Sequence, residues 1–226
     1  MKKKKTANNK YKKTLKPKTE NQERYIRGMV EADITICSGP AGSGKTAVCV
    51  GLACEYLLEQ KVGKIVITRP IVEAGKGLGY LPGGFHEKVQ PYIVPIIEGM
   101  SLYLGRDNFE SLKDSGVVEI CPLEFMRGRN FHGSFIILDE AQNATFEQIK
   151  MFMTRIGRRS KAIINGDLRQ SDLSPRIQGG MEYCIDKLEG LRGVSICELD
   201  DSDIIRHGII SKILDRLSEG EDEWQM

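Results

Sequence analysis

The chain has 226 residues, a formal net charge of +2 and 40% hydrophobic residues, which is enough for one domain with a sizeable core. No uncharged apolar run approaches the ~18 residues of a membrane span, and no apolar stretch at the N-terminus indicates a secretory signal. The six cysteines form no C-x-x-C pair, and four lie in apolar or β-rich runs. We therefore expect reduced, mostly buried thiols in a cytoplasmic protein that has no membrane partner.

The charge is unevenly distributed along the chain. Residues 1–18 contain nine lysines and no acidic residue, which leaves 24 basic against 31 acidic residues in the rest. Few large apolar groups accompany these lysines, so we expect a disordered basic arm. This arm either contacts nucleic-acid phosphates or is a solvated, non-specific tail, and the sequence favours neither. We expect residues 19–218 to form a single domain and residues 219–226 a short acidic tail.

A glutamine precedes the first predicted helix and strand. Residues 23–31 place apolar side chains on one helical face, and residues 34–37 are rich in β-branched side chains, which predicts a helix and then a strand. Gln22 lies just before this helix. Its amide could pair with N6 and N7 of adenine and so favour ATP over GTP, and a plain surface glutamine is an equally good interpretation.

The stretch after this strand reads G-x-x-x-x-G-K-T, which is the pattern of a phosphate-binding loop. An apolar run suited to a buried helix follows, so the motif has the strand, loop and helix context that it requires. The glycines allow the backbone to approach phosphates, and inward N–H groups at a helix N-terminus favour anions. We expect Lys45 to reach the β- and γ-phosphates and Thr46 to bind Mg²⁺. The residues expected to bind the nucleotide are Gly39, Pro40, Ala41, Gly42, Ser43, Gly44, Lys45 and Thr46.

The middle of the chain alternates strand-like runs with segments rich in glycine and proline. Residues 64–69 predict a second strand and residues 117–121 a third. Glycines make up half of residues 75–84, which is typical of a loop with unusual backbone angles or one that lies against a ligand. Residues 87–104 show helical patches that two prolines are expected to break or kink.

Basic residues of this region are candidates for contacts with nucleic acid. Arg127 and Arg129 flank a glycine, which suits a phosphate or RNA backbone, and a solvated basic turn is the alternative. Arg69 at the end of the second strand and Lys76 in the glycine-rich loop complete the expected set.

A second motif follows an apolar run at residues 134–138, which predicts a buried strand that ends in two acids. Ligands of open α/β sheets bind at this carboxyl edge. We expect Asp139 to hold Mg²⁺, partly through water, and Glu140 to activate the attacking water. Two exposed acids at a strand end are the alternative, which the phosphate-binding loop makes the weaker one.

Further helices are predicted in the second half of the chain. Thr145 and Gln148 form a capping box for a helix that Gly157 is expected to end. Residues 177–188 predict another helix, and residues 203–217 a last one with a broad apolar face.

A polar cluster follows the predicted strand at residues 161–166. Gln170 could sense the γ-phosphate, and Asp167 could assist the water or the metal, although both residues are also ordinary in turns. Residues 194–199 predict a last strand. The three histidines are scattered, so we predict no transition-metal site.

Together these motifs resemble the PhoH-like ATPases, which are similar to the first motor domain of superfamily 1 helicases. The resemblance covers about residues 19–217 and rests on ordered blocks that include GPAGSGKT (39–46), ITRPIVEAG (67–75), LGYLPG (78–83), PLEFMRGR (122–129), FIILDEAQN (135–143), NGDLRQ (165–170) and DDSDIIRH (200–207). It implies an α/β P-loop fold of RecA type, with a mostly parallel sheet of core order 5-1-4-3-2 and helices on both faces. It also implies ATP and Mg²⁺ as cofactors, single-stranded RNA as partner, and assembly into a homo-oligomeric, possibly hexameric, ring.

Two positions depart from the family pattern. Lys76 stands where the family usually has an acid, and Gly208 stands where a proline is common. Neither position belongs to the nucleotide chemistry, although the first can alter the nucleic-acid-facing loop. This short form looks similar to phage-encoded members. It leaves no room for the N-terminal nuclease domain of some larger relatives, so no ribonuclease activity is carried over.

A single motor domain lacks the arginine that a second domain gives to the γ-phosphate. Such an arginine finger is worth roughly 10³–10⁵ in rate, so we expect a neighbouring subunit to supply one. Arg206 is the first candidate, followed by Arg155 or Arg158.

Three functions remain open on the sequence. An RNA-dependent ATPase or helicase is favoured, a nucleotide-gated RNA-binding or scaffold protein without unwinding activity is the alternative, and a small-molecule kinase is the weakest.

Overall fold

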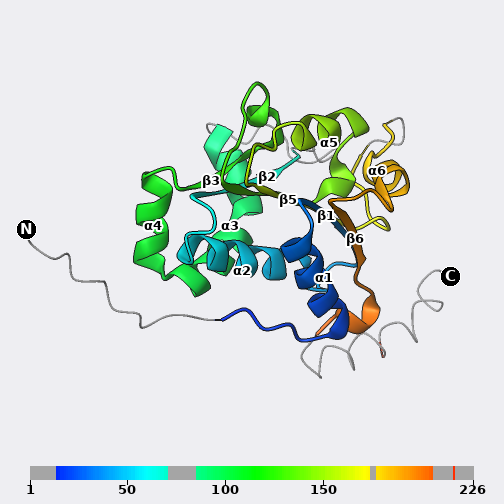
Figure 1. Ribbon diagram of the computed structural model, residues 1–226, viewed down its shortest axis with the longest axis horizontal. Helices are drawn as coiled ribbons and strands as arrows, with labels where there is room; N and C mark the ends of the chain where they lie inside the picture. The colour runs from blue at the N-terminus through cyan, green and yellow to red at the C-terminus, as the bar shows by residue number, and fades with distance from the viewer. Residues whose placement is uncertain (1–13, 71–84, 174–176, 206–215, 217–226) are drawn as a thin grey trace, which may run out of the picture.

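The computed structural model describes residues 14–70, 85–173, 177–205 and 216, whose strands form one six-stranded sheet with helices on both faces (Figure 1). The strands are β1 (Ile34–Ser38), β2 (Lys64–Arg69), β3 (Val118–Pro122), β4 (Ser134–Leu138), β5 (Lys161–Gly166) and β6 (Val194–Glu198). Their order is β3-β2-β4-β5-β1-β6, and all neighbours pair in parallel. The α/β prediction is therefore confirmed. The predicted core order 5-1-4-3-2 numbers the phosphate-loop strand as 1 and the strand before Asp139 as 3, which correspond to β1 and β4. This order is also confirmed, and β3 adds an edge strand beside β2.

The helices cover the two faces unequally. They are α1 (Glu20–Glu31), α2 (Lys45–Leu58), α3 (Phe85–Leu104), α4 (Arg106–Asp114), α5 (Phe146–Met153) and α6 (Met181–Leu188), with 3₁₀ turns η1 (Leu123–Met126), η2 (Ala141–Asn143) and η3 (Asp201–Asp203). Figure 1 shows α1 to α4 on one side of the sheet and α5 and α6 on the other.

Alternation along the strands builds two apolar cores. Phe135 and Ile137 of β4 belong to the core under α1 to α4, whereas Ile136 and Leu138 belong to the core under α5 and α6. Because all four side chains are fully buried, β4 is apolar on both faces, as expected of a central parallel strand. Its carboxyl end therefore carries the first polar side chains, and this is where the site begins.

The prolines at residues 87–104 were expected to break or kink the helix, and of these two outcomes the break is wrong. One continuous helix, α3, runs through Pro91 and Pro95. Each proline removes one backbone hydrogen bond, but α3 packs along α2 and buries Ile96 and Met100, so tertiary packing outweighs the lost bonds. The following helix α4 was not predicted, because Phe109 alone among its residues is buried and the remaining pattern is polar.

Three helix boundaries also differ from prediction. Helix α1 begins at Glu20 after its N-cap Thr19, so Gln22 lies inside the helix and not before it. The other two differences also have local causes. Helix α5 ends before Gly157, whose N–H donates instead to the carbonyl of Phe131 at 2.7 Å. Helix α6 starts later than predicted, because the N–H of Gly180 donates to the carbonyl of Ala144 at 2.9 Å. The capping box of α5 is confirmed.

Several predictions concern residues that the structure does not describe. The glycine-rich loop with Lys76, the last helix beyond residue 205 with Arg206, most of the basic arm and the acidic tail lie outside the described residues. Among the described helices, none has the length and apolarity to cross a membrane. All six thiols are free, and burial raises the pKa of Cys54 to about 12.

Candidate nucleotide-binding site

The phosphate-binding loop connects β1 to α2 at the carboxyl edge of the sheet. Two of its glycines are required by geometry. Gly44 has φ of +93°, in the left-handed region that favours glycine. A Cβ on Gly39 would lie 2.7 Å from the carbonyl oxygen of Leu199, so only glycine lets β1 turn beside β6. The loop is thus held by the strand behind it as well as by its own turn.

Lys45 and Thr46 open α2 and point toward different partners. The ammonium of Lys45 donates to the carbonyls of Gly39 and Pro40, the latter at 2.8 Å, which keeps it over the loop. Thr46 Oγ1 donates to Asp139 Oδ1 at 2.9 Å. The structure therefore brings the two motifs, the phosphate-binding loop and the acidic strand end, into direct contact.

Asp139 is the most enclosed acid of the site. It is 1% exposed, and its backbone N–H donates to the carbonyl of Thr68 on β2. One carboxylate oxygen accepts from Thr46, and the other accepts from the guanidinium of Arg69 at 2.6 and 3.1 Å. The Arg69 contact was not predicted, because it depends on the register of β2 with β4.

Thr46 and Asp139 also fit the metal that the loop motif implies. Mg²⁺ prefers oxygen ligands and is usually bound through one or two protein oxygens together with substrate phosphates and water. The hydroxyl and carboxylate oxygens that lie 2.9 Å apart here are such a donor set. Within the described residues, no group of three or more His, Cys, Asp or Glu side chains forms an all-protein cage.

Glu140 departs from ordinary backbone geometry. Its φ is +56°, a left-handed conformation that costs a glutamate of the order of 1 kcal/mol or more. Its Oε2 accepts from Gln142 Nε2 at 2.7 Å, and its Oε1 lies 3.6 Å from the Arg69 guanidinium. A strained backbone at a residue of this kind is typical of a functional site.

Gln142, within the FIILDEAQN motif (135–143), is a candidate functional residue for which no role was predicted. Its Nε2 donates to Glu140, and its Oε1 accepts from the N–H of Asp167 at 3.0 Å. Asp167 is buried, and its Oδ2 accepts from the N–H of Ala41 at 3.2 Å. A chain of hydrogen bonds thus joins Glu140 to the phosphate-binding loop. The sequence signal for this role of Gln142 was its position two residues after Glu140, at a strand end.

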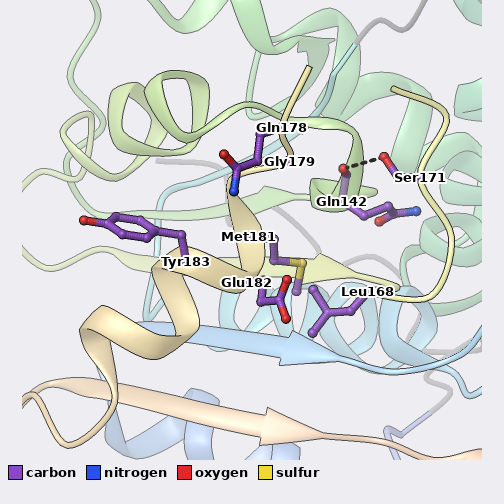
Figure 2. Close-up of a pocket in the computed structure, with 8 residues that line it drawn as sticks. All are labelled: Gln142, Leu168, Ser171, Gln178, Gly179, Met181, Glu182 and Tyr183. Carbon is purple, nitrogen blue, oxygen red and sulfur yellow. Dashed lines mark hydrogen bonds between the residues drawn. The ribbon is translucent and has the colours of Figure 1, made fainter. Parts of the chain in front are cut away.

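A cavity of about 200 Å³ adjoins this chain of bonds, and its walls include Gln142, Leu168, Ser171, Gln178, Met181 and Glu182. Figure 2 shows the side chain of Gln142 directed away from Gln178, while its backbone carbonyl accepts from Ser171 Oγ at 3.3 Å. Gln142 thus both lines the cavity and donates to Glu140.

Gln22 lies against the loop, on the side of α1. It is 4% exposed, its Nε2 donates to the carbonyl of Ser43 at 2.9 Å, and its Oε1 accepts from the N–H of Lys18. Thr19 and Asn21 tie the start of α1 to the buried carboxylate of Asp203. An amide has two donors and two acceptor sites, so one of each remains on Gln22.

Gln170 is a predicted site residue that lies at the surface. Its side chain is exposed, and its N–H donates to the carbonyl of Asp167 at 3.2 Å. Asp167 is the member of this cluster that touches the phosphate-binding loop.

The three predicted nucleic-acid residues that the structure describes do not gather in one place. Arg69 lies in the nucleotide site. Arg129 pairs through two nitrogens with Glu119, at 2.5 and 2.8 Å, near the amino ends of the strands, where Lys64 also contacts Glu119. The side-chain hydrogen bond from Arg129 is the largest of the effects that lower the pKa of Glu119 to about 2. Arg127 is exposed.

The two described arginine-finger candidates lie opposite the nucleotide site. The carbonyls of Arg155 and Arg158 accept from the N–H groups of Phe131 and Gly133, which lead into the amino end of β4. They cannot reach the phosphate-binding loop of their own chain, since that loop is at the carboxyl edge of the same sheet.

Known proteins match the chain over most of its length. A family model described as PhoH-like protein matches residues 14–218. The chain is 43% identical to a PhoH-like protein of Bacillus subtilis (strain 168) over 203 residues, which are 90% of this chain and 64% of that protein. It is 35% identical to Protein PhoH of Escherichia coli (strain K12) over 199 residues, 87% of this chain and 56% of that protein. The chain thus spans less than two thirds of the length of these relatives.

Solved structures share the fold at low sequence identity. The UvsW helicase from bacteriophage T4 matches with a TM-score of 0.50 and 16% identity, over 84% of this chain and 63% of that one. The large terminase from a thermophilic bacteriophage matches with a TM-score of 0.57 and 12% identity, over 89% of this chain and 50% of that one.

Proposed function

The chain belongs to the PhoH-like protein family, and on this premise we propose that it is a Mg²⁺-dependent ATPase that acts on or with single-stranded nucleic acid, RNA above all. The observation that carries the proposal is the contact of Thr46 with Asp139, which joins the phosphate-binding loop to the acidic strand end. Neither motif alone specifies hydrolysis, but together they provide a phosphate cradle, a metal-binding pair and a base.

Each residue has a distinct part in the proposed reaction. Lys45 exchanges its loop carbonyls for the β- and γ-phosphates, and Thr46 and Asp139 hold the metal. Bound Mg²⁺ supplies positive charge to the phosphate oxygens. Glu140, oriented by Gln142, accepts the proton of the attacking water. General-base catalysis of this kind contributes about 10²–10⁴ in rate.

Two further residues serve recognition in this proposal. Gln22 uses its remaining donor and acceptor to pair with adenine. Its hydrogen bond to the Ser43 carbonyl keeps the Gln22 amide next to the loop. Gln170 senses the γ-phosphate from the segment that also carries Asp167.

Nucleic-acid binding and assembly are proposed on charge and on the family. Arg69, Lys76, Arg127 and Arg129 are the proposed phosphate contacts. A ring of identical chains would bring an arginine of one subunit to the site of the next. Arg206 is the first candidate, followed by Arg155 or Arg158. Because Arg155 and Arg158 lie at the amino ends of the strands, these two could act only on the site of a neighbour. A strictly monomeric protein with full ATPase activity would contradict this assembly.

The decisive experiment is phosphate release from ATP with and without single-stranded RNA, at salt concentrations from roughly 50 to 200 mM. We expect RNA to stimulate hydrolysis at low salt and the stimulation to fade as salt rises, because phosphate contacts release counterions. Single-stranded DNA of the same length is the matched comparison. No phosphate release under any condition would contradict the proposed activity.

One observation supports a second candidate, a nucleotide-gated RNA-binding or scaffold protein that unwinds nothing. Arg69 contacts both catalytic carboxylates, a resting arrangement that would keep hydrolysis slow. Slow hydrolysis that RNA does not change, with no strand separation in an unwinding assay, would favour this alternative.

A further inference from the structure

Arg69 is the last residue of β2 and a cation that contacts the two acids after β4, Asp139 and Glu140. Its Nη2 lies 2.6 Å from Asp139 Oδ2 and 3.6 Å from Glu140 Oε1, and its Nε lies 3.1 Å from the same Asp139 oxygen. The pairing follows from the fold, because Thr68 is level with Leu138 in the parallel ladder and the next residues of the two strands are Arg69 and Asp139.

Both oxygens of Asp139 are therefore already engaged. Oδ1 accepts from Thr46, and Oδ2 accepts from two nitrogens of Arg69. The carboxylate side chain is 2% exposed, so it needs a compensating charge, and the guanidinium provides it. A divalent cation at Asp139 would take over this compensation and would repel the arginine at close range.

Arg69 can also leave this position more readily than the acid that it neutralises. Its side chain is 21% exposed, and a guanidinium pairs as readily with a phosphate as with a carboxylate. Glu140 would move with it, since its carboxylate contacts both Arg69 and Gln142.

We propose that Arg69 is a positioning residue that competes with Mg²⁺ for Asp139 and holds Glu140 in a resting orientation, and that a backbone phosphate of single-stranded nucleic acid draws it away. The inference rests on the proposed function and deepens it, because it names the contact through which a polynucleotide would increase metal binding and hydrolysis.

The first test is the Mg²⁺ concentration needed for half-maximal binding of a fluorescent, non-hydrolysable ATP analogue. Arg69→Gln removes the competing charge, so the half-saturating Mg²⁺ concentration is expected to fall roughly tenfold. Arg69→Lys keeps the charge without the forked contact and is expected to lie between the two. Arg24→Gln, which breaks an exposed arginine–glutamate pair on α1, is the matched control and should leave the value unchanged.

The outcomes separate this inference from the proposed function. A wild-type protein that binds the analogue, with the same Mg²⁺ requirement in Arg69→Gln and Arg69→Lys, would overturn the inference alone. A wild-type protein that binds no nucleotide at any Mg²⁺ concentration would overturn both. If Arg69→Gln does not fold, as its thermal unfolding would show, Arg69→Lys decides the question.

The second test adds single-stranded RNA to the same titration. We expect RNA to lower the Mg²⁺ requirement of the wild type toward the value of Arg69→Gln, and to leave the variant itself unchanged. An equal shift in both proteins would overturn the part of the proposal that assigns the nucleic-acid response to Arg69.

Discussion

At the scale of single residues, the site depends on side chains that bridge two motifs. Thr46 joins the loop to Asp139, and Gln142 joins Glu140 to Asp167, which in turn binds the loop backbone at Ala41. Each bridge uses a partly or fully buried polar group, whose bonds are stronger than they would be in water. The position of Glu140, the proposed base, is thus tied by hydrogen bonds to the phosphate-binding loop.

Gln142→Ala tests this dependence. The variant frees Glu140 on one side, so we expect kcat to fall roughly tenfold or more while KM for ATP changes little, because an oriented base acts mainly in the transition state. Steady-state phosphate release at varied ATP measures both. Gln178→Ala, at a neighbouring glutamine on the far side of the cavity, is the control, and an equal loss in that variant would contradict the assignment.

At the scale of elements, the parallel strands are fixed by packing on two faces and by a few polar ties at their ends. The edge strand β3 is held to β2 by its ladder and by Glu119, which pairs with Lys64 and Arg129. Gly180, the residue before α6, lets that helix approach the start of α5. At each of these places a single residue determines how a strand or helix packs against its neighbour.

The ion pairs of Glu119 with Lys64 and Arg129 predict a pH dependence of stability. The pKa of Glu119 is lowered to about 2 in the folded protein from 4.5, so its contribution is present above pH 4.5 and is lost as the pH falls toward 2. Glu119→Gln removes this contribution. We expect denaturant unfolding to show the wild type more stable than the variant by about 1–2 kcal/mol at pH 7, allowing for solvent screening, with a smaller difference at about pH 3.5. A difference that stays constant over this range would exclude the carboxylate as its source.

Gly180→Ala tests the docking of α6 on α5. A Cβ at this position would lie 2.2 Å from the backbone nitrogen and 2.3 Å from the Cα of Phe146, so one backbone segment must move. We expect a loss of about 1–3 kcal/mol in the free energy of unfolding. Gly63→Ala is the control, since its Cβ would meet nothing closer than 4.0 Å. Equal unfolding free energies for the two variants would mean that the approach is not tight.

At the scale of the whole molecule, the sheet order places the phosphate-binding loop, the acidic strand end and the Asp167 segment together, since β1, β5 and β4 are neighbours. The arginine-finger candidates Arg155 and Arg158 are at the opposite edge. Among the residues that the structure describes, a single chain therefore offers Arg69 as the cation beside Asp139 and Glu140, its proposed catalytic acids. This asymmetry is the structural basis for proposing a neighbouring subunit.

Local signals predicted much of this arrangement, and non-local ones explain the rest. The glycine loop, the apolar strand of β4 and the capping box of α5 are encoded in adjacent residues, so the sequence was sufficient for them. The partner of Asp139 depends on which strand lies beside β4 and in what register, which no local pattern states. The continuous helix α3 through Pro91 and Pro95 likewise depends on its packing against α2.

The central claim is that the loop and the acidic strand end form one Mg²⁺–ATP site, and Glu140→Gln tests it most directly. Turnover of ATP and affinity for the nucleotide are measured on the same preparation, with Lys45→Ala beside it. We expect Glu140→Gln to bind ATP as the wild type does and to release phosphate at least about 100-fold more slowly, since it keeps the shape of the side chain and loses the base. Lys45→Ala should lose affinity as well. Wild-type turnover in Glu140→Gln would contradict the account.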